Sequence, residues 1–282
     1  MSGNALKKLG IDIPENNPTK GILVRLSPAQ YLEIKKGLQP VLQSIGDAGF
    51  WRSGGAGSFD PEHRYAHKGT HKIDSGDVDV FMDAVKIKHH LRLDPNTDDA
   101  GVRKTVLQHM LKHYPALQIG KNVHIGYPTG HKINNLPTYF QVDLMIMEHA
   151  HEIGQHHEHD YSVKDSPYGG QDQQFAMASV INTIPGHPPK TFQYNGFGGA
   201  LQNRATGEVI TRDINKVAEI ALGKGHTADD LGNVESIIKA VGGINSPRLE
   251  QFRADMAKKY PGHAIKEGSA DWFRLLQRKL GI

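Results

Sequence analysis

The 282-residue chain contains no cysteine. Disulfides, zinc–thiolate sites, iron–sulfur clusters and thiol nucleophiles are therefore excluded. The chain also lacks any run of about 18 apolar residues, the length that a membrane-spanning helix needs. Residues 1–20 are polar and contain no apolar core of a signal peptide. From these absences we expect a cytoplasmic protein that has no membrane partner.

A strong charge imbalance is absent as well. Lysine and arginine number 33 and aspartate and glutamate number 30, which leaves a formal net charge of +3. This balance argues neither for nor against a polyanionic partner, although 17 histidines would add positive charge below about pH 6.5. A hydrophobic fraction of 38% is ordinary for a globular protein of one large or two small domains.

Two common nucleotide-binding motifs are also missing. No segment fits the G-x-x-x-x-G-K-[S/T] pattern of a P-loop. The glycine run at residues 54–57 does not fit the G-x-G-x-x-G dinucleotide fingerprint either. A nucleotide site in this chain would have to be of another kind.

Two segments in the first half of the chain predict helices. Residues 27–45 begin with Ser27, a good N-cap, and Gln30 completes an S-x-x-Q capping box. Pro40 is expected to kink this helix. Residues 97–114 carry apolar residues at helical spacing and predict a second helix.

Strands and loops are predicted around these helices. A short strand leads into a glycine loop at residues 54–57, and residues 59–76 read as a polar loop. Residues 117–127 and 138–147 predict two strands of a hairpin, joined by a loop at residues 128–137.

The second half of the chain is mainly helical in pattern. A histidine-rich loop at residues 148–160 precedes a predicted helix at 169–184, and a helical pattern begins again at Asp213. A hairpin is expected between these two helical regions. Turn and cap signals lie at Thr206-Gly207, Ser246-Pro247 and Ser269.

These patterns predict an α+β protein. A small mixed or antiparallel sheet would be flanked by helices and followed by a mostly helical C-terminal part. The boundary is expected near residue 165. The expected parts are an N-terminal arm at 1–26, an α/β domain at 27–165 and a mostly helical domain with a short hairpin at 166–282.

Residues 71–84, HKIDSGDVDVFMDA, place aspartates on what otherwise reads as a buried strand. Because alternate side chains of a strand share a face, Asp77 and Asp79 are expected on one face with Phe81. The two valines and the methionine that alternate with them would face the core. Two carboxylates on one face repel each other unless a cation lies between them. Carboxylate oxygens are hard ligands that suit magnesium or manganese.

A second strand repeats this pattern. In FQVDLMIM, residues 140–147, Val142, Leu144 and Ile146 form an apolar face, and Asp143 interrupts the opposite face. A third carboxylate on a neighbouring strand would complete a cage for divalent ions, and two such ions can support an in-line displacement at phosphorus. An aspartate pair by itself is more often a solvated strand face. The glycine run upstream and the third aspartate downstream favour the metal site.

The helix, the short strand, SGGAG, SGDVDVFMD and QVDLMIM together resemble the DNA polymerase beta-type nucleotidyltransferase superfamily. Its signature is an apolar residue, Gly, Gly or Ser, then Asp-x-Asp on a strand and a third Asp on a later strand. The resemblance covers residues 27–147, and the chain is most similar to nucleotidyltransferase-like proteins encoded by tailed phages, which would act in the host cytoplasm. Two features depart from the pattern: Ser53 stands where an apolar residue is usual, and the gap from Gly55 to Asp77 is long.

The resemblance implies an activity. A nucleoside monophosphate would move from a nucleoside triphosphate to a hydroxyl acceptor, with release of pyrophosphate and with two Mg²⁺ or Mn²⁺ ions. The base preference and the acceptor, whether RNA, a protein or a small molecule, stay open. A catalytically silent nucleotide- or nucleic-acid-binding protein on the same fold, acting as a phage-associated factor, is the alternative function.

The resemblance also implies roles for residues. Asp77 and Asp79 would bind both metals, and Asp143 would bind the metal that activates the acceptor hydroxyl. Gly54 and Gly55 would let the backbone approach the triphosphate, because a side chain there would block it.

Other polar residues are expected near the nucleotide. Ser75 would hold a phosphate or orient Asp77. The insert at residues 59–76 is either a mobile surface loop or a source of phosphate contacts from Arg64, Lys68 and Lys72. Candidates for phosphate, base or acceptor contacts after the histidine-rich loop are Lys164, Tyr168 and Gln174.

The five histidines of residues 148–160 allow a transition-metal site, since neutral imidazole binds zinc, nickel or copper. Their spacing is unfavourable, because His151-Glu152 is followed by His156, one residue too far for H-E-x-x-H. We expect a solvated loop instead.

Overall fold

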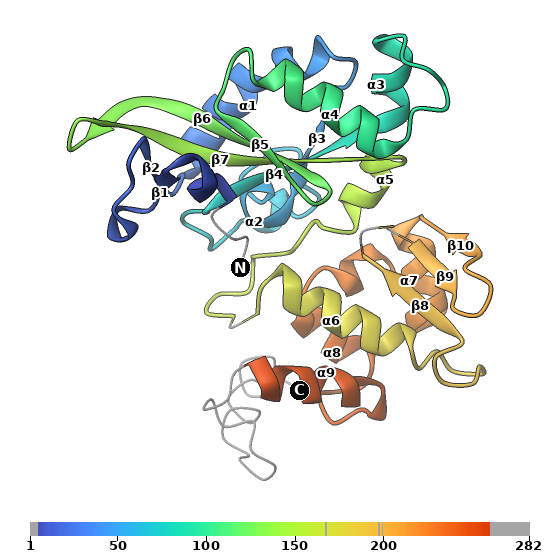
Figure 1. Ribbon diagram of the computed structural model, residues 1–282. Helices are drawn as coiled ribbons and strands as arrows, with labels where there is room; N and C mark the ends of the chain where they lie inside the picture. The colour runs from blue at the N-terminus through green and yellow to red at the C-terminus, as the bar shows by residue number, and fades with distance from the viewer. Residues whose placement is uncertain (1–4, 167, 197, 199, 260–282) are drawn as a thin grey trace. The chain divides into compact units, whose positions relative to one another are not determined.

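The structure is a computed structural model of the chain, and it describes residues 5–166, 168–196, 198 and 200–259. The chain divides into two compact units, Met1–Lys164 (unit 1) and Asp165–Ile282 (unit 2) (Figure 1). The division lies beside the boundary expected near residue 165.

Unit 1 is built on a mixed seven-stranded sheet flanked by helices. Its strands are β1 (Ile11–Asp12), β2 (Gly21–Leu23), β3 (Phe50–Ser53), β4 (Asp77–Asp83), β5 (Ala116–Ile119), β6 (Asn122–Ile133) and β7 (Leu136–Met147). Strand β7 is central: it pairs antiparallel with β6 along one side and parallel with β4 and β2 along the other. Strand β3 runs antiparallel to β4, β5 antiparallel to β6, and β1 parallel to β2.

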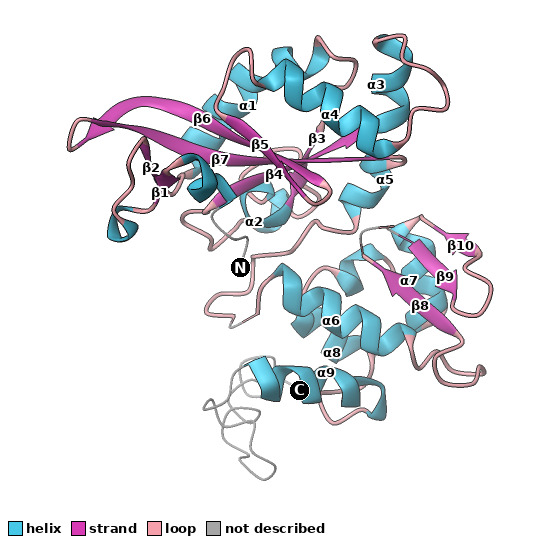
Figure 2. Cartoon of the chain, viewed as in Figure 1, coloured by secondary structure: helices cyan, strands magenta, loops and turns pink. Residues whose placement is uncertain are grey.

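Helices cover both faces of this sheet (Figure 2). One face carries α1 (Pro28–Gln43), α3 (Ala84–His90) and α4 (Asp99–Met110). On the other side, α5 (Ala150–Gln155) packs against β3 and β4, and the one-turn helix α2 (Gly54–Gly57) lies beside β4. Short 3-10 helices complete the unit at Ala5–Leu9 (η1), Pro14–Asn16 (η2) and Ala66–Lys68 (η3).

The predicted capping box at the start of α1 is present. The side chain of Gln30 accepts a hydrogen bond from the N–H of Ser27 at 2.8 Å, and the hydroxyl of Ser27 accepts one from the N–H of Gln30 at 3.5 Å. The helix continues through Pro40 to Gln43. The pattern therefore located this helix to within two residues of its ends.

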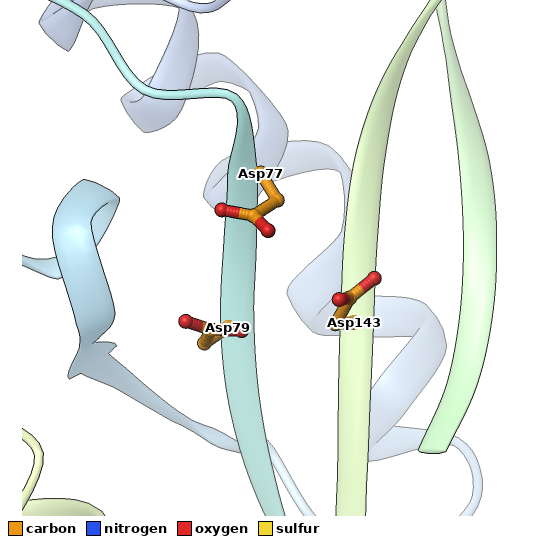
Figure 3. Close-up of side chains that lie close together, drawn as sticks. All are labelled: Asp77, Asp79 and Asp143. Atoms are coloured by element: carbon orange, nitrogen blue, oxygen red, sulfur yellow. The ribbon is translucent and has the colours of Figure 1, made fainter. Parts of the chain in front are cut away.

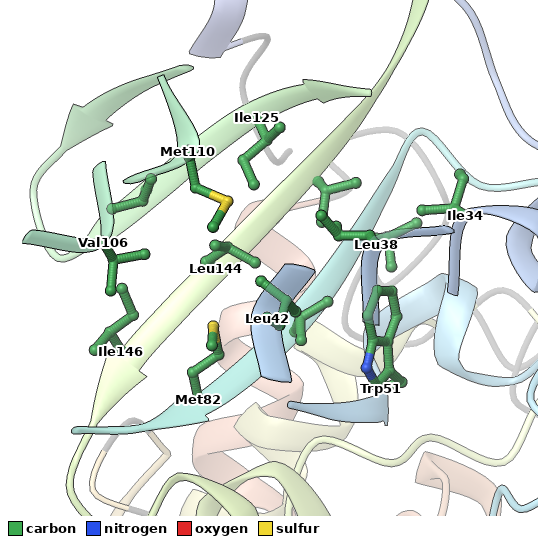
Figure 4. Packing of buried hydrophobic residues seen from close by; sticks show 14 of the residues in the cluster. Ile34, Leu38, Leu42, Trp51, Met82, Val106, Met110, Ile125, Leu144 and Ile146 are labelled. Atoms are coloured by element: carbon green, nitrogen blue, oxygen red, sulfur yellow. The ribbon is translucent and has the colours of Figure 1, made fainter. Parts of the chain in front are cut away.

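The side chains of β4 alternate between the two faces of the sheet, as predicted. Val78, Val80 and Met82 are buried in the main core with side chains of α1, α4 and β7 (Figure 4). Phe81 points the other way, into a second apolar cluster that includes Phe50 of β3. Two cores on opposite sides thus fix the face on which the aspartates of β4 lie.

Three expectations about local structure were wrong. The glycine run at residues 54–57 forms the short helix α2 rather than a loop. Residues 117–127 form parts of two strands, β5 and β6, which turn at Gly120. The expected loop at residues 128–137 is mostly strand, because β6 and β7 continue to a tight turn at Asn134-Asn135, where both residues have positive φ.

Residues 1–26 are not a separate arm over their described part. Strand β2 pairs with Thr138 and Tyr139 of β7, and η1 buries Leu6 completely. The N-terminal segment is part of unit 1, because β2 pairs with β7 beyond the end of β4 and η1 packs against β5 and β6.

The histidine segment, residues 148–160, is not a solvated loop. It contains α5, and His156 and His159 are only 1% and 2% exposed. The insert at residues 59–76 is fastened to α1 and to this segment rather than being a free surface loop. Asp60 accepts hydrogen bonds from the side chains of Tyr31 at 2.9 Å and Lys35 at 2.6 Å.

Unit 2 combines helices with a three-stranded antiparallel sheet in the order β10-β9-β8. Its strands are β8 (Phe192–Asn195), β9 (Ala200–Asn203) and β10 (Val209–Thr211). Its helices are α6 (Gly170–Ile181), α7 (Ile214–Leu222), η4 (Ala228–Leu231), α8 (Val234–Ala240), η5 (Pro247–Leu249) and α9 (Glu250–Lys259). The expected turn at Thr206-Gly207 joins β9 and β10, and the hydroxyl of Ser246 caps η5. Ser269 lies outside the described residues.

Among the described residues, none of the helices has both the length and the apolar character needed to cross a membrane.

Candidate metal centre

Three aspartates from two adjacent strands share one face of the sheet (Figure 3). Asp77 and Asp79 lie on β4, and Asp143 lies on β7 directly opposite Asp79 in the register. One carboxylate oxygen from each of the three lies within 4.8 Å of the others. The parallel pairing of β4 and β7 therefore joins residues that are more than 60 positions apart in the chain.

The electrostatics of this cluster favour a bound cation. Burial raises the pKa of Asp79 well above its usual value, and the charges of Asp77 and Asp143 raise it further. A divalent ion between the carboxylates would remove this repulsion. The donor set consists of carboxylate oxygens, which fits a hard ion such as Mg²⁺ or Mn²⁺.

Asp143 is held by two neighbours that the sequence did not single out. The ring of His124, opposite it on β6, places Nδ1 2.8 Å from Asp143 Oδ1. The side-chain amide of Gln141 donates to the same oxygen at 3.0 Å. Both contacts engage Oδ1 and leave Oδ2 outside these two hydrogen bonds. A carboxylate oriented in this way loses little freedom when it binds a metal.

The glycine run at the end of β3, residues 54–57 of the one-turn helix α2, faces the aspartates and is called the glycine turn below. Gly54 has φ +65°, and a Cβ at this position would clash with Asp79 Oδ2. Ser53, opposite Asp79 in the register, is fully buried and donates its hydroxyl hydrogen bond to the carbonyl of Gly154 at 2.9 Å. This bond satisfies the buried hydroxyl of Ser53.

Cationic and hydroxyl groups gather beside the glycine turn. A Cβ on Gly55 would lie 2.8 Å from Lys72 Nζ and 3.1 Å from the hydroxyl of Ser75. Burial, together with the nearby charge of Arg25, lowers the pKa of Lys72, whose ammonium also lies 4.9 Å from the centre of the Tyr161 ring. Two cations from separate segments, Arg25 and Lys72, thus lie close enough to Asp77 for its charge to raise their pKa values.

The other two cations of the insert have different partners. Arg64 pairs with the buried Glu158 at 3.3 Å, and Lys68 pairs with the buried Asp160 at 3.0 Å. Both are committed to fastening the insert to the histidine segment. Of the three cations proposed for phosphate contacts, Lys72 is the one that the structure brings to the aspartates.

Two further predicted nucleotide contacts are not brought to this cluster within unit 1. Lys164 is exposed at the end of that unit. Tyr168 belongs to unit 2, where it is 6% exposed and packs against Phe252 in the apolar core.

The histidine segment supports the glycine turn instead of forming a metal site of its own. The carbonyl of His157 accepts the N–H of Gly54 at 3.1 Å, and Glu158 pairs with Arg52 at 3.4 Å. Within the described part of the chain, the aspartate triad is the one group of three or more histidine or acidic side chains that is close enough to hold an ion.

Of the three residues near the site that the sequence did not single out, Gln141 and His124 carry a sequence signal and Arg25 does not. Gln141-Val142-Asp143 repeats the alternation of Asp77-Val78-Asp79, so Gln141 had to share a face with Asp143. His124 likewise alternates with core residues of β6. Arg25 carries no such signal, because a bridge between Leu26 and Ser75 and an ion pair with Asp74 at 2.7 Å bring it close.

A comparison of the chain with models of known protein families finds no match, and a comparison with curated proteins finds none either. Functional assignment therefore depends on the geometry of the aspartates and their surroundings.

Proposed function

We propose that the protein is a metal-dependent nucleotidyltransferase that moves a nucleoside monophosphate from a nucleoside triphosphate to a hydroxyl acceptor and releases pyrophosphate. The observation that carries this proposal is the approach of Asp77, Asp79 and Asp143 to within 4.8 Å of one another on adjacent strands. The sheet of unit 1 would then be a nucleotidyltransferase sheet, with the glycine turn after β3, Asp-x-Asp on β4 and the third aspartate on β7.

The aspartates would hold two divalent ions. Such ions, when bound, neutralise phosphate charge and lower the pKa of an attacking hydroxyl. Asp77 and Asp79, on β4, would contact both ions, whereas Asp143, which approaches from β7, would contact the ion that activates the acceptor hydroxyl.

The triphosphate would lie along the glycine turn. Gly54 and Gly55 expose backbone without a side chain, and Ser75 and Lys72 offer a hydroxyl and an ammonium beside Gly55. A cation at this place would stabilise the negative charge that develops on the leaving pyrophosphate. Bond formation from the acceptor oxygen to the α-phosphorus and loss of pyrophosphate would occur between these two groups of residues.

The test is a transfer assay. The protein would be incubated with each α-³²P-labelled nucleoside triphosphate and with Mg²⁺ or Mn²⁺. RNA, small hydroxyl compounds and protein, including the chain itself, would be supplied as acceptors. We expect labelled product and matching pyrophosphate from the wild type and none from Asp79→Asn or Asp143→Asn.

A matched control is available on the same strand. Asp83 ends β4 and caps α3 by accepting the N–H of Val85 at 2.8 Å. Asparagine is an equally good cap, so Asp83→Asn should retain full transfer. Equal turnover in Asp79→Asn and the wild type would contradict the proposal. So would the absence of transfer with every combination of triphosphate, metal and acceptor. Thermal stabilisation by triphosphate without turnover would point instead to a silent nucleotide-binding protein.

A further inference from the structure

Gln141 spans the distance between the metal centre and the N-terminal segment. Its amide nitrogen donates to Asp143 Oδ1 at 3.0 Å, and its amide oxygen accepts the backbone N–H of Ala5 at 3.2 Å. Gln141 is 3% exposed and Ala5 is 8% exposed. Both ends of one buried amide are therefore satisfied by residues that are far apart in the chain.

The two hydrogen bonds depend on each other. A carboxamide has its donor and acceptor at opposite sides of a rigid plane, so the bond to Ala5 determines which side faces Asp143. If the N–H of Ala5 moved away, the buried oxygen of Gln141 would lose its partner, which is unfavourable. The amide would then be free to rotate, and the orientation of Asp143 would depend on His124 alone.

The position of Ala5 is in turn set by its neighbour Leu6. Leu6 is completely buried. It packs over Gly126, where a Cβ would lie 3.5 Å from Leu6 Cδ1. Gly126 is the register partner of Gln141 on β6. The leucine that anchors η1 therefore sits next to the glutamine that contacts the third aspartate.

We propose that Gln141 is a positioning residue that couples the docking of η1 to the orientation of Asp143, and so to metal affinity and turnover. This inference rests on the proposed function, since it assigns a role to Asp143 as a metal ligand. When η1 is docked, Oδ1 of Asp143 is held by His124 and Gln141, and the carboxylate is ready to bind an ion. When η1 is undocked, one of these two constraints is lost.

The test uses full-length variants and two measurements. Gln141→Met removes both hydrogen bonds at similar side-chain volume, and Leu6→Ala weakens the docking of η1 without altering Gln141. The affinity for Mn²⁺ would be measured by electron paramagnetic resonance of the free ion. The values of kcat and KM for the triphosphate would come from the transfer assay.

We expect each variant to weaken Mn²⁺ binding by about tenfold, the usual size of an effect through a residue behind a metal ligand. The value of kcat should fall by a similar factor, while KM stays nearly constant. The double variant should be no weaker than Gln141→Met, because both changes act on one pathway.

Leu38→Ala provides the structural control. Leu38 is as completely buried as Leu6, but it lies in the core on the helix α1 face of the sheet. The Leu38→Ala variant should lose thermal stability but keep its Mn²⁺ affinity unchanged. Unchanged Mn²⁺ affinity in Leu6→Ala, or additive effects in the double variant, would overturn the coupling alone. Absence of Mn²⁺ binding in the wild type would overturn the proposed function and the coupling together.

Discussion

The backbone of Gly54 lies against the carboxylate of Asp79, so closely that a Cβ on residue 54 would clash with Asp79 Oδ2. Gly54→Ala should therefore displace Asp79, and we expect transfer activity to fall on the order of a hundredfold, as small misplacements of reacting groups can cause. The change also places alanine at φ +65°, which costs about 1–2 kcal/mol of stability. Activity at saturating metal and a thermal melt would measure the two effects.

Gly69→Ala separates these effects. Gly69 has φ +75° and no heavy atom within 4 Å of a Cβ built there. Its ψ of 173° is in a region almost restricted to glycine, so the substitution should destabilise the protein at least as much but leave transfer intact. A similar loss of activity in both variants would show that backbone strain, and not the approach to Asp79, is responsible.

Lys72 gives a second prediction. Removal of its charge in Lys72→Met should raise KM for the triphosphate by about tenfold, the loss expected for one hydrogen bond to a charged group. Lys104 is an exposed lysine of α4, on the opposite face of the sheet. Lys104→Met should leave KM unchanged, and steady-state kinetics of both variants would decide the matter. An unchanged KM in Lys72→Met would remove this residue from the phosphate site.

The raised pKa of Asp79 predicts an inverse dependence of stability on pH in the metal-free protein. Since the folded-state pKa lies above the unfolded value of about 3.9, the carboxyl group destabilises the folded protein only above that pH. The destabilisation grows until the pH reaches the folded-state pKa. Asp79→Asn should therefore melt a few degrees higher than the wild type at pH 8 without metal. The difference should shrink as the pH is lowered toward about 4.

Added metal should reverse the order of the melting temperatures of Asp79→Asn and the wild type. Mg²⁺ should raise the melting temperature of the wild type at pH 8 and have little effect on Asp79→Asn, because ligand binding stabilises only the protein that binds. A metal-free difference that is constant between pH 5 and pH 8 would contradict the electrostatic explanation.

Asp47, in the same unit, predicts the opposite dependence of stability on pH. Burial alone would raise its pKa, but hydrogen bonds from His151 and from the N–H of Asp83, together with the charge of Lys86, hold the pKa below its usual value. The stabilisation is therefore present above the unfolded pKa of about 3.9 and is lost as the pH falls through the lowered one.

Asp47→Asn should cost about 1–2 kcal/mol at pH 7, and its denaturation midpoint should converge with that of the wild type in acid. The exposed Asp94 is a suitable comparison. Asp94→Asn should change stability by less than about 0.5 kcal/mol. A deficit in Asp47→Asn that persists below pH 3 would indicate lost packing instead of lost charge.

The features that the sequence predicted are those with a local cause. The alternation of β4 follows from side chains that point to opposite faces, and this alone places Asp77 with Asp79. The capping box at Ser27 needs only four consecutive residues. The approach of Asp143 required the additional assumption that β4 and β7 are neighbours, which the resemblance supplied.

The features that could not be predicted depend on distant partners. Pro128 and Gly130 read as loop residues, yet β6 accommodates them through a shift of register between Pro128 and Lys132. The histidine segment is polar in composition but buried, because its acidic residues meet Arg64 and Lys68 of the insert. Ion pairs between separate segments leave no periodic signal in either one.

The most direct test of the account is a crystal of the protein grown with Mn²⁺ and a non-hydrolysable nucleoside triphosphate analogue, with the anomalous signal of manganese recorded. The account predicts two manganese peaks coordinated by the carboxylates of Asp77, Asp79 and Asp143, with the triphosphate along Gly54 and Gly55. Manganese peaks only elsewhere on the protein, or none in saturating Mn²⁺, would contradict it.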